Sequence, residues 1–177
     1  RELPSTTLHL VDDPTTQREI AEQYVAGFRE TGDVPYNFTS FAANPHLTPE
    51  VEEYLVKNIE GGQARKLLLW NRAKFTENPV VFEDVVEDGD ACSRVEDRPE
   101  GLATPEHFFE QMLENPDCLE GLKRIHAGRM HPANAVQLTE ATARKLRAGE
   151  ISEEDANALV KKTMEGSHRQ DAELLSS

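Results

Sequence analysis

Apolar residues recur at intervals of three and four along most of this chain, which is the spacing of one face of an α-helix. The first such stretch follows Asp13 and Pro14, a capping residue and a residue favoured in a first helical turn, and Gly32 closes it. Its apolar positions form a single stripe made of Ile20, Ala21, Tyr24, Val25 and Phe28. The pattern predicts a helix that Asp13 caps and that runs to about Thr31.

The same start and stop signals recur along the rest of the chain. Further helix starts are predicted at Thr48, Gln63, Thr104, Asn115, His131 and Ser152, and Thr139 is a further capping residue after His131. Each apolar face needs a neighbour to cover it, so consecutive helices are expected to pair. The predicted fold class is mostly α, with six to seven short helices in antiparallel hairpins, an α-solenoid-like arrangement and short extended arms.

These signals divide the chain into five regions. We expect an extended arm at 1–12, an N-terminal helical region at 13–78, an acidic extended segment at 79–103, C-terminal helical hairpins at 104–166 and a tail at 167–177. The segment 79–103 is expected to be extended because it begins with a valine-rich run and continues into a charged sequence rich in turn residues.

The predicted helix that begins at Gln63 carries the densest basic cluster of the N-terminal region. Arg65, Lys66 and Arg72 accompany Trp70 on it. Such a cluster could contact an acidic protein or a nucleic acid, whereas the simpler interpretation places Trp70 in the core behind a solvated basic rim. We keep Arg65, Lys66 and Arg72 as candidate partner-binding residues.

The segment 83–101 carries many carboxylates and only Arg94 and Arg98 to oppose them. Burying these charges would be costly, so a solvated or partner-wrapping role is expected. An EF-hand spacing set on Gly89 would place Val86 and Val95 where calcium needs oxygen ligands, which excludes a calcium loop. The candidate partner-binding residues of this segment are Glu83, Asp84, Glu87, Asp88 and Asp90.

No constellation in the sequence predicts catalysis, a cofactor or a metal ion. His126 and His131 would lie about 140° apart around a helix. Cys118 would lie about 12 Å along the helix from His126, too far for proton transfer. Gly61 and Gly62 are not followed by the sequence of a phosphate loop. We therefore expect no enzyme, with no catalytic, cofactor-binding or metal-binding residues.

Composition narrows the choice of partner and compartment. The chain has 177 residues, of which 37% are hydrophobic, and a net charge of −14. This acidity disfavours nucleic acid as a partner. No apolar run approaches the roughly 20 residues that a membrane span needs. Two cysteines without a paired spacing favour a reducing compartment inside the cell.

The C-terminal half shows a repeat-like spacing. Its helix starts near Thr104 and Thr139, and near Asn115 and Ser152, are separated by about 35 residues, close to the period of two-helix repeats. A further stretch resembles the second half of a pentatricopeptide-type hairpin, on the residues Lys145, Leu146, Arg147, Ala148, Gly149, Ala156, Leu159, Met164 and Gly166.

In size, helix count and charge the chain is similar to small, processed, acidic pentatricopeptide-like accessory subunits of mitochondrial assemblies, such as the one on the F1 head of euglenozoan ATP synthases. This resemblance implies a helical-repeat fold and a location in the mitochondrial matrix ahead of the cytoplasm. Most families with this hairpin bind RNA through basic faces, whereas this chain is acidic, so the expected partners are proteins.

These observations favour a non-catalytic interaction or structural subunit that docks on other protein subunits of a larger assembly. The resemblance suggests a mitochondrial ATP synthase or another respiratory complex. The alternatives are a viral or phage structural protein and an RNA-binding helical-repeat protein. Because the chain begins at Arg1, we expect a processed product, for which removal of a transit peptide, a polyprotein cut and an engineered boundary all fit.

Overall fold

The chain folds into helices joined by short loops. The computed structural model describes residues 5–87, 91, 93–124 and 130–161. Across those residues the backbone forms helices and turns and no β-strand. The predicted mostly-α fold class is therefore confirmed.

The helices are more numerous than the six or seven expected. In chain order they are α1 (Ser5–Leu8), α2 (Pro14–Thr31), α3 (Phe38–Ala42), α4 (Pro49–Asn58), α5 (Gly62–Phe75), α6 (Pro79–Glu87), the 3₁₀-helix η1 (Ser93–Asp97), α8 (Pro105–Glu114), α9 (Pro116–Arg124) and α10 (Pro132–Arg147). Residues 153–161 are helical as well.

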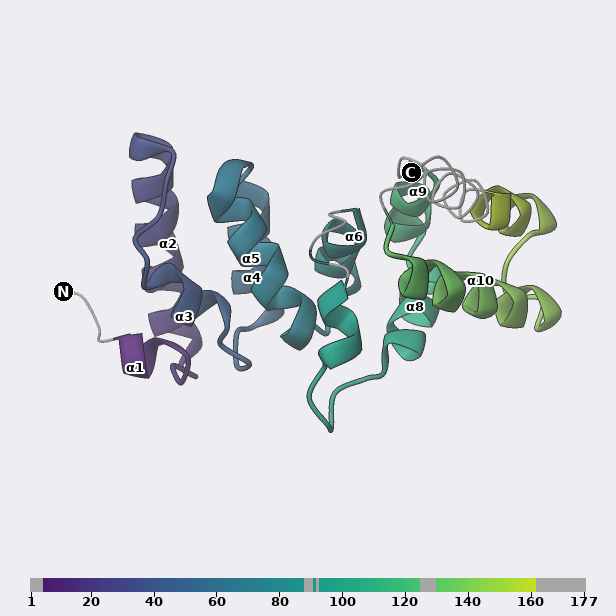
Figure 1. Ribbon diagram of the computed structural model, residues 1–177, viewed down its shortest axis with the longest axis horizontal. Helices are drawn as coiled ribbons and strands as arrows, with labels where there is room; N and C mark the ends of the chain where they lie inside the picture. The colour runs from purple at the N-terminus through teal and green to yellow at the C-terminus, as the bar shows by residue number, and fades with distance from the viewer. Residues whose placement is uncertain (1–4, 88–90, 92, 125–129, 162–177) are drawn as a thin grey trace, which may run out of the picture.

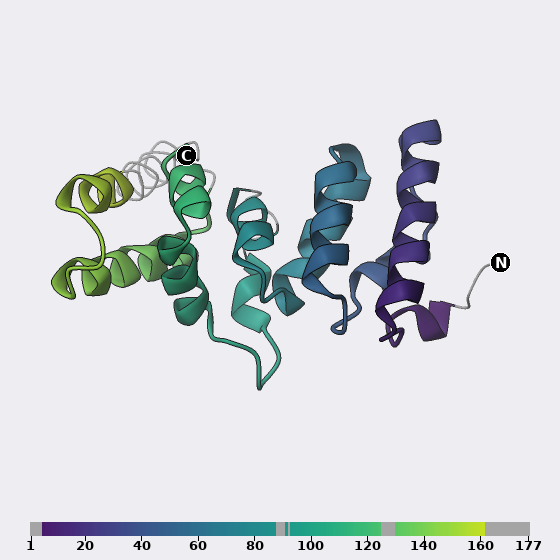
Figure 2. The ribbon, with the colours of Figure 1, turned by 180° about the vertical axis from the view of Figure 1, so that it is seen from behind.

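The helices follow one another along the long axis of the molecule, from α2 at one end to α10 at the other (Figures 1 and 2). Each helix packs mainly on neighbours in this row: α2 on α4, α5 on α6, and α6 on both α8 and α9. At the far end α10 lies crosswise against α8. The molecule is thus an elongated array in which each helix covers the apolar face of the next.

The predicted helix starts are confirmed where a side chain caps the first turn. Asp13 Oδ2 accepts hydrogen bonds from the backbone N–H of Thr16 at 2.8 Å and from its hydroxyl at 2.7 Å. Thr48 and Thr104 each accept one from the backbone N–H three residues later, at 3.2 Å. Ser152 does the same at 3.1 Å. Each such cap contributes about 1 kcal/mol to helix stability.

Two groups of aromatic rings mark the core. In the N-terminal half the ring centre of Tyr24 lies 5.0 Å from that of Phe38 and 5.6 Å from that of Phe41. These contacts pack α3 against α2. In the C-terminal half the ring of Phe82 lies 4.9 Å from Phe108 and 5.5 Å from Phe109, which fastens α6 onto α8. The two groups belong to one continuous cluster of buried residues.

The extended arm expected at 1–12 was wrong for its middle part. Residues 5–8 form α1, and Leu8 is 2% exposed in the core. The carbonyl groups of Leu8 and Val11 accept hydrogen bonds from the side-chain amide of Asn44, at 3.0 and 2.8 Å. This tertiary contact holds α1 and the residues up to Val11 against the end of α3, and no local sequence pattern predicts it. Residues 1–4 lie outside the described residues.

The acidic extended segment expected at 79–103 was also wrong where it begins. Pro79–Glu87 form α6, and Val81, Phe82, Val85 and Val86 are buried against the neighbouring helices. Valine favours strands in isolation, but these four residues also follow helical spacing, and burial of that face outweighs the weak intrinsic preference. The carboxylates of α6 lie on its other sides.

The helix start predicted at Thr139 was wrong as well. His131 caps α10 through Nδ1, which accepts a hydrogen bond from the backbone N–H of Ala133 at 3.3 Å, and the helix continues through Thr139. The Thr139 hydroxyl donates to the carbonyl of Ala135 at 2.9 Å, a bond made inside a helix. The repeat-like spacing that relied on this start is therefore not a spacing of helix starts.

Arg98 joins the two halves of the array. Its guanidinium donates to the carbonyl groups of Ala73 at 3.3 Å and Thr76 at 2.7 Å, near the end of α5, and to that of Ala103 at 3.0 Å, just before α8. It also lies 4.0 Å from the centre of the Phe108 ring. Burial lowers the pKa of Arg98 to about 10, so it remains a cation at neutral pH.

Candidate functional site

The candidate site is a groove between the first turns of α5 and the last turn of α6. It encloses about 310 Å³ and is lined by Gly61, Gly62, Arg65, Lys66, Leu69, Asp84 and Glu87. Four of these residues were predicted from two separate stretches of sequence, one basic and one acidic. The structure brings both stretches to the same place, which the sequence alone did not indicate.

The turn from α4 into α5 shapes the groove. Gly62 has φ of 71°, in the left-handed region that favours glycine, and a Cβ added there would meet no neighbouring atom. The turn lets α5 run back along α4. As a result the start of α5 lies beside the end of α4, close to the end of α6.

Arg65 holds the wall of the groove in place. Its Nη1 donates to the carbonyl groups of Val56 at 2.6 Å and Ile59 at 3.0 Å, at the end of α4. Its Nη2 lies 3.4 Å from Asp84 Oδ1 on α6. Arg65 therefore ties three helices together, and the predicted partner-binding residue has a structural role in the groove wall.

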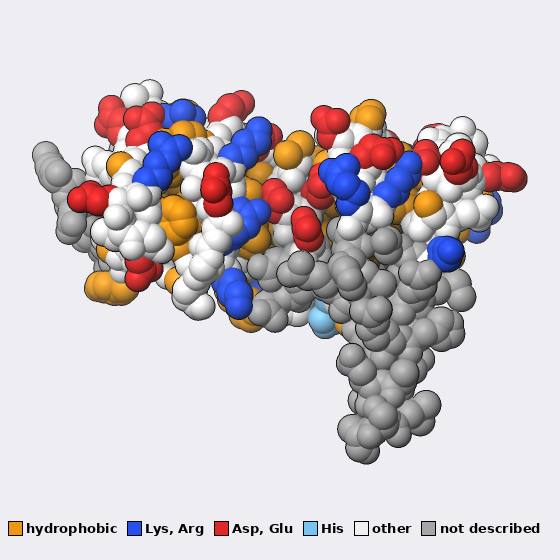
Figure 3. Space-filling view, turned by 90° about the horizontal axis from the view of Figure 1, so that it is seen from above, with side chains coloured by type: hydrophobic (Ala, Val, Ile, Leu, Met, Phe, Trp, Pro, Cys, Tyr) orange, Lys and Arg blue, Asp and Glu red, His pale blue; other side chains and the backbone are white. Residues whose placement is uncertain are grey.

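Lys66 and Glu87 differ from Arg65, because both side chains are exposed at the rim of the groove. Among the residues that the structure describes, neither forms an ion pair with a neighbour. Figure 3 shows acidic and basic side chains interspersed on the face seen from above. Lys66 and Glu87 are thus available to groups of either sign on another molecule.

Asp84 is half-buried in the groove wall. Burial raises the pKa of its carboxyl above the ordinary value, Arg65 opposes that rise, and the nearby carboxylate of Glu87 adds to it. Asp84 is therefore held in place by Arg65 at a cost in desolvation. The groove wall is thus held by an ion pair between α5 and α6.

Glu83 points to the other side of α6, against α9. Helix α9 comes so close at Gly121 that a side chain there would collide with the Glu83 carboxylate. Burial is the largest cause that raises the pKa of Glu83, and Asp84 adds to it, while Arg124 and a hydrogen bond with Cys118 act in the other direction. Glu83, one of the candidate partner-binding residues, is thus partly buried in the α6–α9 contact.

We predict that Glu83→Gln stabilises the protein at neutral pH. The folded state raises the pKa of Glu83, so its ionisation disfavours folding as the pH rises through that pKa. The gain in free energy of unfolding should therefore be present at pH 7 and shrink below the ordinary value of 4.5. Urea unfolding of the wild type and the variant at pH 7 and below pH 4.5 measures this gain.

Glu87→Gln is the matched control for this prediction, because it removes the same charge from an exposed position on the same helix. Both variants reduce the overall negative charge equally. They differ in that Glu83 is partly buried, and burial is the largest cause that raises its pKa, whereas Glu87 is exposed. An equal gain in the two variants, or a loss of stability in Glu83→Gln, would contradict the explanation.

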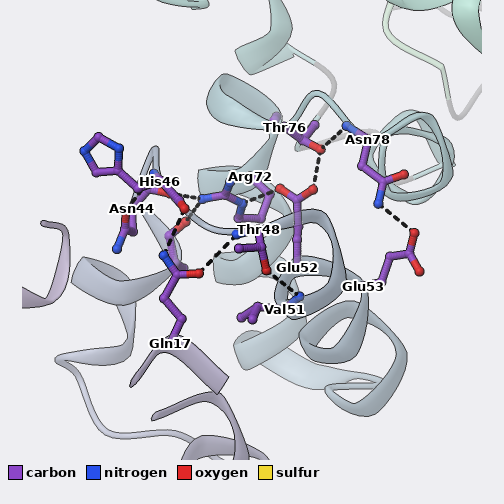
Figure 4. A network of polar contacts seen from close by, with 12 residues as sticks. Gln17, Asn44, His46, Thr48, Val51, Glu52, Glu53, Arg72, Thr76 and Asn78 are labelled. Carbon is purple, nitrogen blue, oxygen red and sulfur yellow. Dashed lines mark hydrogen bonds and ion pairs between the residues drawn. The ribbon is translucent and has the colours of Figure 1, made fainter. Parts of the chain in front are cut away.

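Arg72 was wrongly predicted to bind a partner, since it is 1% exposed. Its Nε donates to Glu52 Oε2 at 2.6 Å, and its Nη1 donates to the carbonyl groups of Ala42 at 2.8 Å and Asn44 at 2.6 Å (Figure 4). Thr76 completes the pairing by donating to Glu52 Oε1 at 2.6 Å. Arg72 therefore belongs to a buried polar network.

The network continues to α2 through Gln17, which is fully buried. Its side-chain Nε2 donates to the carbonyl groups of Val11 at 2.8 Å and His46 at 2.9 Å, and its Oε1 accepts from the backbone N–H of Thr48 at 3.1 Å. Figure 4 shows Gln17 facing the loop that leads into α4. These bonds satisfy backbone groups that no helix pairs.

Trp70 was wrongly placed in the core, since 39% of it is exposed. The guanidinium carbon of Arg94, from η1, lies 4.7 Å from the centre of its ring. Trp70 is therefore a surface aromatic residue covered in part by an arginine. Asp88 and Asp90, the remaining candidate partner-binding residues, lie outside the described residues.

Cys118 is buried in the α6–α9 contact. Burial, followed by the charge of Glu83, raises the pKa of its thiol to about 12, so the thiol stays protonated and is a poor nucleophile. His126, which the sequence already placed too far from Cys118 for proton transfer, lies outside the described residues. Within the described part of the chain, no three histidine, cysteine or acidic side chains are grouped closely enough to hold a metal ion.

None of the helices that the structure describes is long and apolar enough to span a bilayer. Comparisons of the chain with protein-family models, with curated proteins and with solved structures found no match. The groove, its charged rim and the adjoining face of α5 are therefore the features of the molecule that bear on its function.

Proposed function

We propose that this chain is a non-catalytic interaction subunit that docks on a larger protein assembly through the groove between α5 and α6. The observation that supports this proposal is the pair of exposed charges, Lys66 and Glu87, on the rim of a groove whose wall is already held by Arg65 and Asp84. Charges on a rigid rim, without partners among the described residues, are suited to selecting a complementary surface.

Two features of the groove favour a protein partner. Its rim carries both signs of charge, which rejects a partner of uniform charge and accepts one with a matching pattern. The wall is rigid before binding, since Arg65 contacts α4 and α6 at once, so little conformational entropy is lost when a partner docks. The pentatricopeptide resemblance puts a mitochondrial ATP synthase or another respiratory complex first among the assemblies to examine.

The test is charge reversal at the rim. We expect Lys66→Glu to weaken association with the native assembly by about tenfold or more, because it replaces an attraction with a repulsion. Lys161→Glu is the control. Lys161 is exposed on the helical residues 153–161, so this substitution makes the same change of charge far from the groove along the array. Tagged chains purified gently from the native source, with the co-purifying subunits quantified, give the measurement.

Three results would contradict the proposal. A wild-type chain that purifies alone from its native source has no assembly to join. Equal loss of association in Lys66→Glu and Lys161→Glu would mean that overall charge, and no particular site, controls docking. Steeply salt-dependent binding to RNA would instead support the alternative of an RNA-binding helical repeat.

A further inference from the structure

The outward face of α5 continues from the groove as a strip with its own character. Lys66, Trp70 and Lys74 are spaced by four residues, so they lie along one side of the helix. Lys66 is exposed, Trp70 is 39% exposed and Lys74 is partly exposed. We call these three residues together with Arg94 the Trp70 face.

Arg94 gives this face its chemistry. Its guanidinium lies over the Trp70 ring, 4.7 Å from the ring centre. Among the described residues it makes no ion pair, and its Nε, which solvent does not reach, has no hydrogen-bond acceptor. An arginine stacked on an aromatic ring keeps its planar donors in a fixed orientation, which suits a carboxylate. The face therefore offers a positioned donor group beside an aromatic ring that is 39% exposed.

We propose that the Trp70 face binds an acidic segment of the partner protein, whose carboxylate pairs with Arg94 and whose neighbouring apolar side chain covers Trp70. This inference rests on the proposed docking function and deepens it, because Lys66 belongs both to the groove and to the Trp70 face. Tryptophan and arginine are also the residues most enriched among those that dominate binding energy at protein interfaces.

Local charge favours an acidic peptide over a nucleic acid. The face gathers three cations on a chain whose net charge is −14. Exposed carboxylates lie close to it along the chain, at Glu77, Glu96 and Asp97. A single carboxylate side chain needs only the cationic spot, whereas a phosphate backbone would have to run past these carboxylates. The acidic residue and its apolar neighbour therefore fit where a nucleic-acid strand is repelled.

The chain supplies its own reporter, since Trp70 is the single tryptophan in the sequence. The probe is a short, otherwise neutral peptide with one glutamate beside a leucine, compared with the same peptide carrying glutamine in place of the glutamate, and with oligouridylate. We expect the acidic peptide to shift the Trp70 emission to shorter wavelength in a saturable manner. The glutamine peptide and the Arg94→Gln variant should each bind about tenfold more weakly, and Lys161→Gln should bind as the wild type does.

An equal response to the acidic and glutamine peptides, or a response to oligouridylate alone, would overturn the inference. The native assembly separates its failure from that of the proposed function. If a chain carrying both Trp70→Ala and Arg94→Gln joins the assembly as fully as the wild type, the Trp70 face is not the contact, yet docking stands. If the wild-type chain joins no assembly, the docking function itself fails.

Discussion

Replacing Arg72 by methionine is expected to lower the free energy of unfolding by about 3–5 kcal/mol, because it leaves the buried Glu52 carboxylate without its cation. The side chains of Arg72 and Glu52 are 1% and 3% exposed, so water cannot take the place of the missing partner. Two backbone carbonyl groups, those of Ala42 and Asn44, lose a donor at the same time. A loss of this size is a large fraction of the about 5–15 kcal/mol that stabilises a typical domain.

Urea unfolding followed by circular dichroism measures this loss, with Lys57→Met as the control. Lys57 is exposed and lies 3.9 Å from Glu53, an ion pair between solvated groups, so its replacement should change stability by less than about 0.5 kcal/mol. A double-mutant cycle with Glu52→Gln then isolates the coupling between the buried partners. Similar small effects at positions 72 and 57 would show that the buried pair does not hold α4 and α5 together.

Arg72 also shows where sequence reasoning stops. Its position in a basic cluster made it a candidate for partner binding, since a charged residue on a helix is usually exposed. Its burial depends on Glu52, twenty positions earlier on another helix, and on two carbonyl groups, one at the end of α3 and one in the loop that follows. No local pattern encodes such a contact. The clue that was available in the sequence was Glu52, an acidic residue next to the apolar Val51 in the helix that Thr48 begins.

Helix ends were far easier to predict, because caps are local. Asp13, Thr48, Thr104 and Ser152 each satisfy a backbone N–H within their own first turn, so the signal and the structure lie within four residues. The inward faces were predictable for the same reason. In α8 the four apolar residues that recur at helical spacing, Phe108, Phe109, Met112 and Leu113, are all buried.

The groove was predictable in part, less than the helix caps and more than the burial of Arg72. Arg65, Lys66, Asp84 and Glu87 were all identified as candidate residues, but as members of two unrelated segments. Their convergence follows from α6, whose helical form was missed because its valines favour extended backbone. Once Pro79–Glu87 form a helix beside α5, their carboxylates reach the basic residues of α5. A correct prediction of this helix would have given the right conformation for Asp84 and Glu87, whereas its position beside α5 depends on tertiary packing.

Replacing Phe82 by alanine tests this helix and is expected to lower the free energy of unfolding by about 3–5 kcal/mol. Phe82 is fully buried, and its ring contacts those of Phe108 and Phe109 on α8. Truncation leaves a cavity at the junction between α6 and α8, and rigid aromatic neighbours cannot collapse to fill it. The alternative expectation, an exposed acidic segment, predicts no loss at all.

Urea unfolding measures the loss, and hydrogen exchange tells where it arises. In the wild type the amides of Val85 and Val86 should be protected nearly as strongly as global unfolding allows, since both residues are fully buried on the same face as Phe82. Tyr36→Ala is the control, because 89% of Tyr36 is exposed and its loss should change stability by less than about 0.5 kcal/mol. Rapid exchange along α6 together with a negligible effect of Phe82→Ala would show that residues 79–87 do not form a buried helix. The groove would then lack its acidic side.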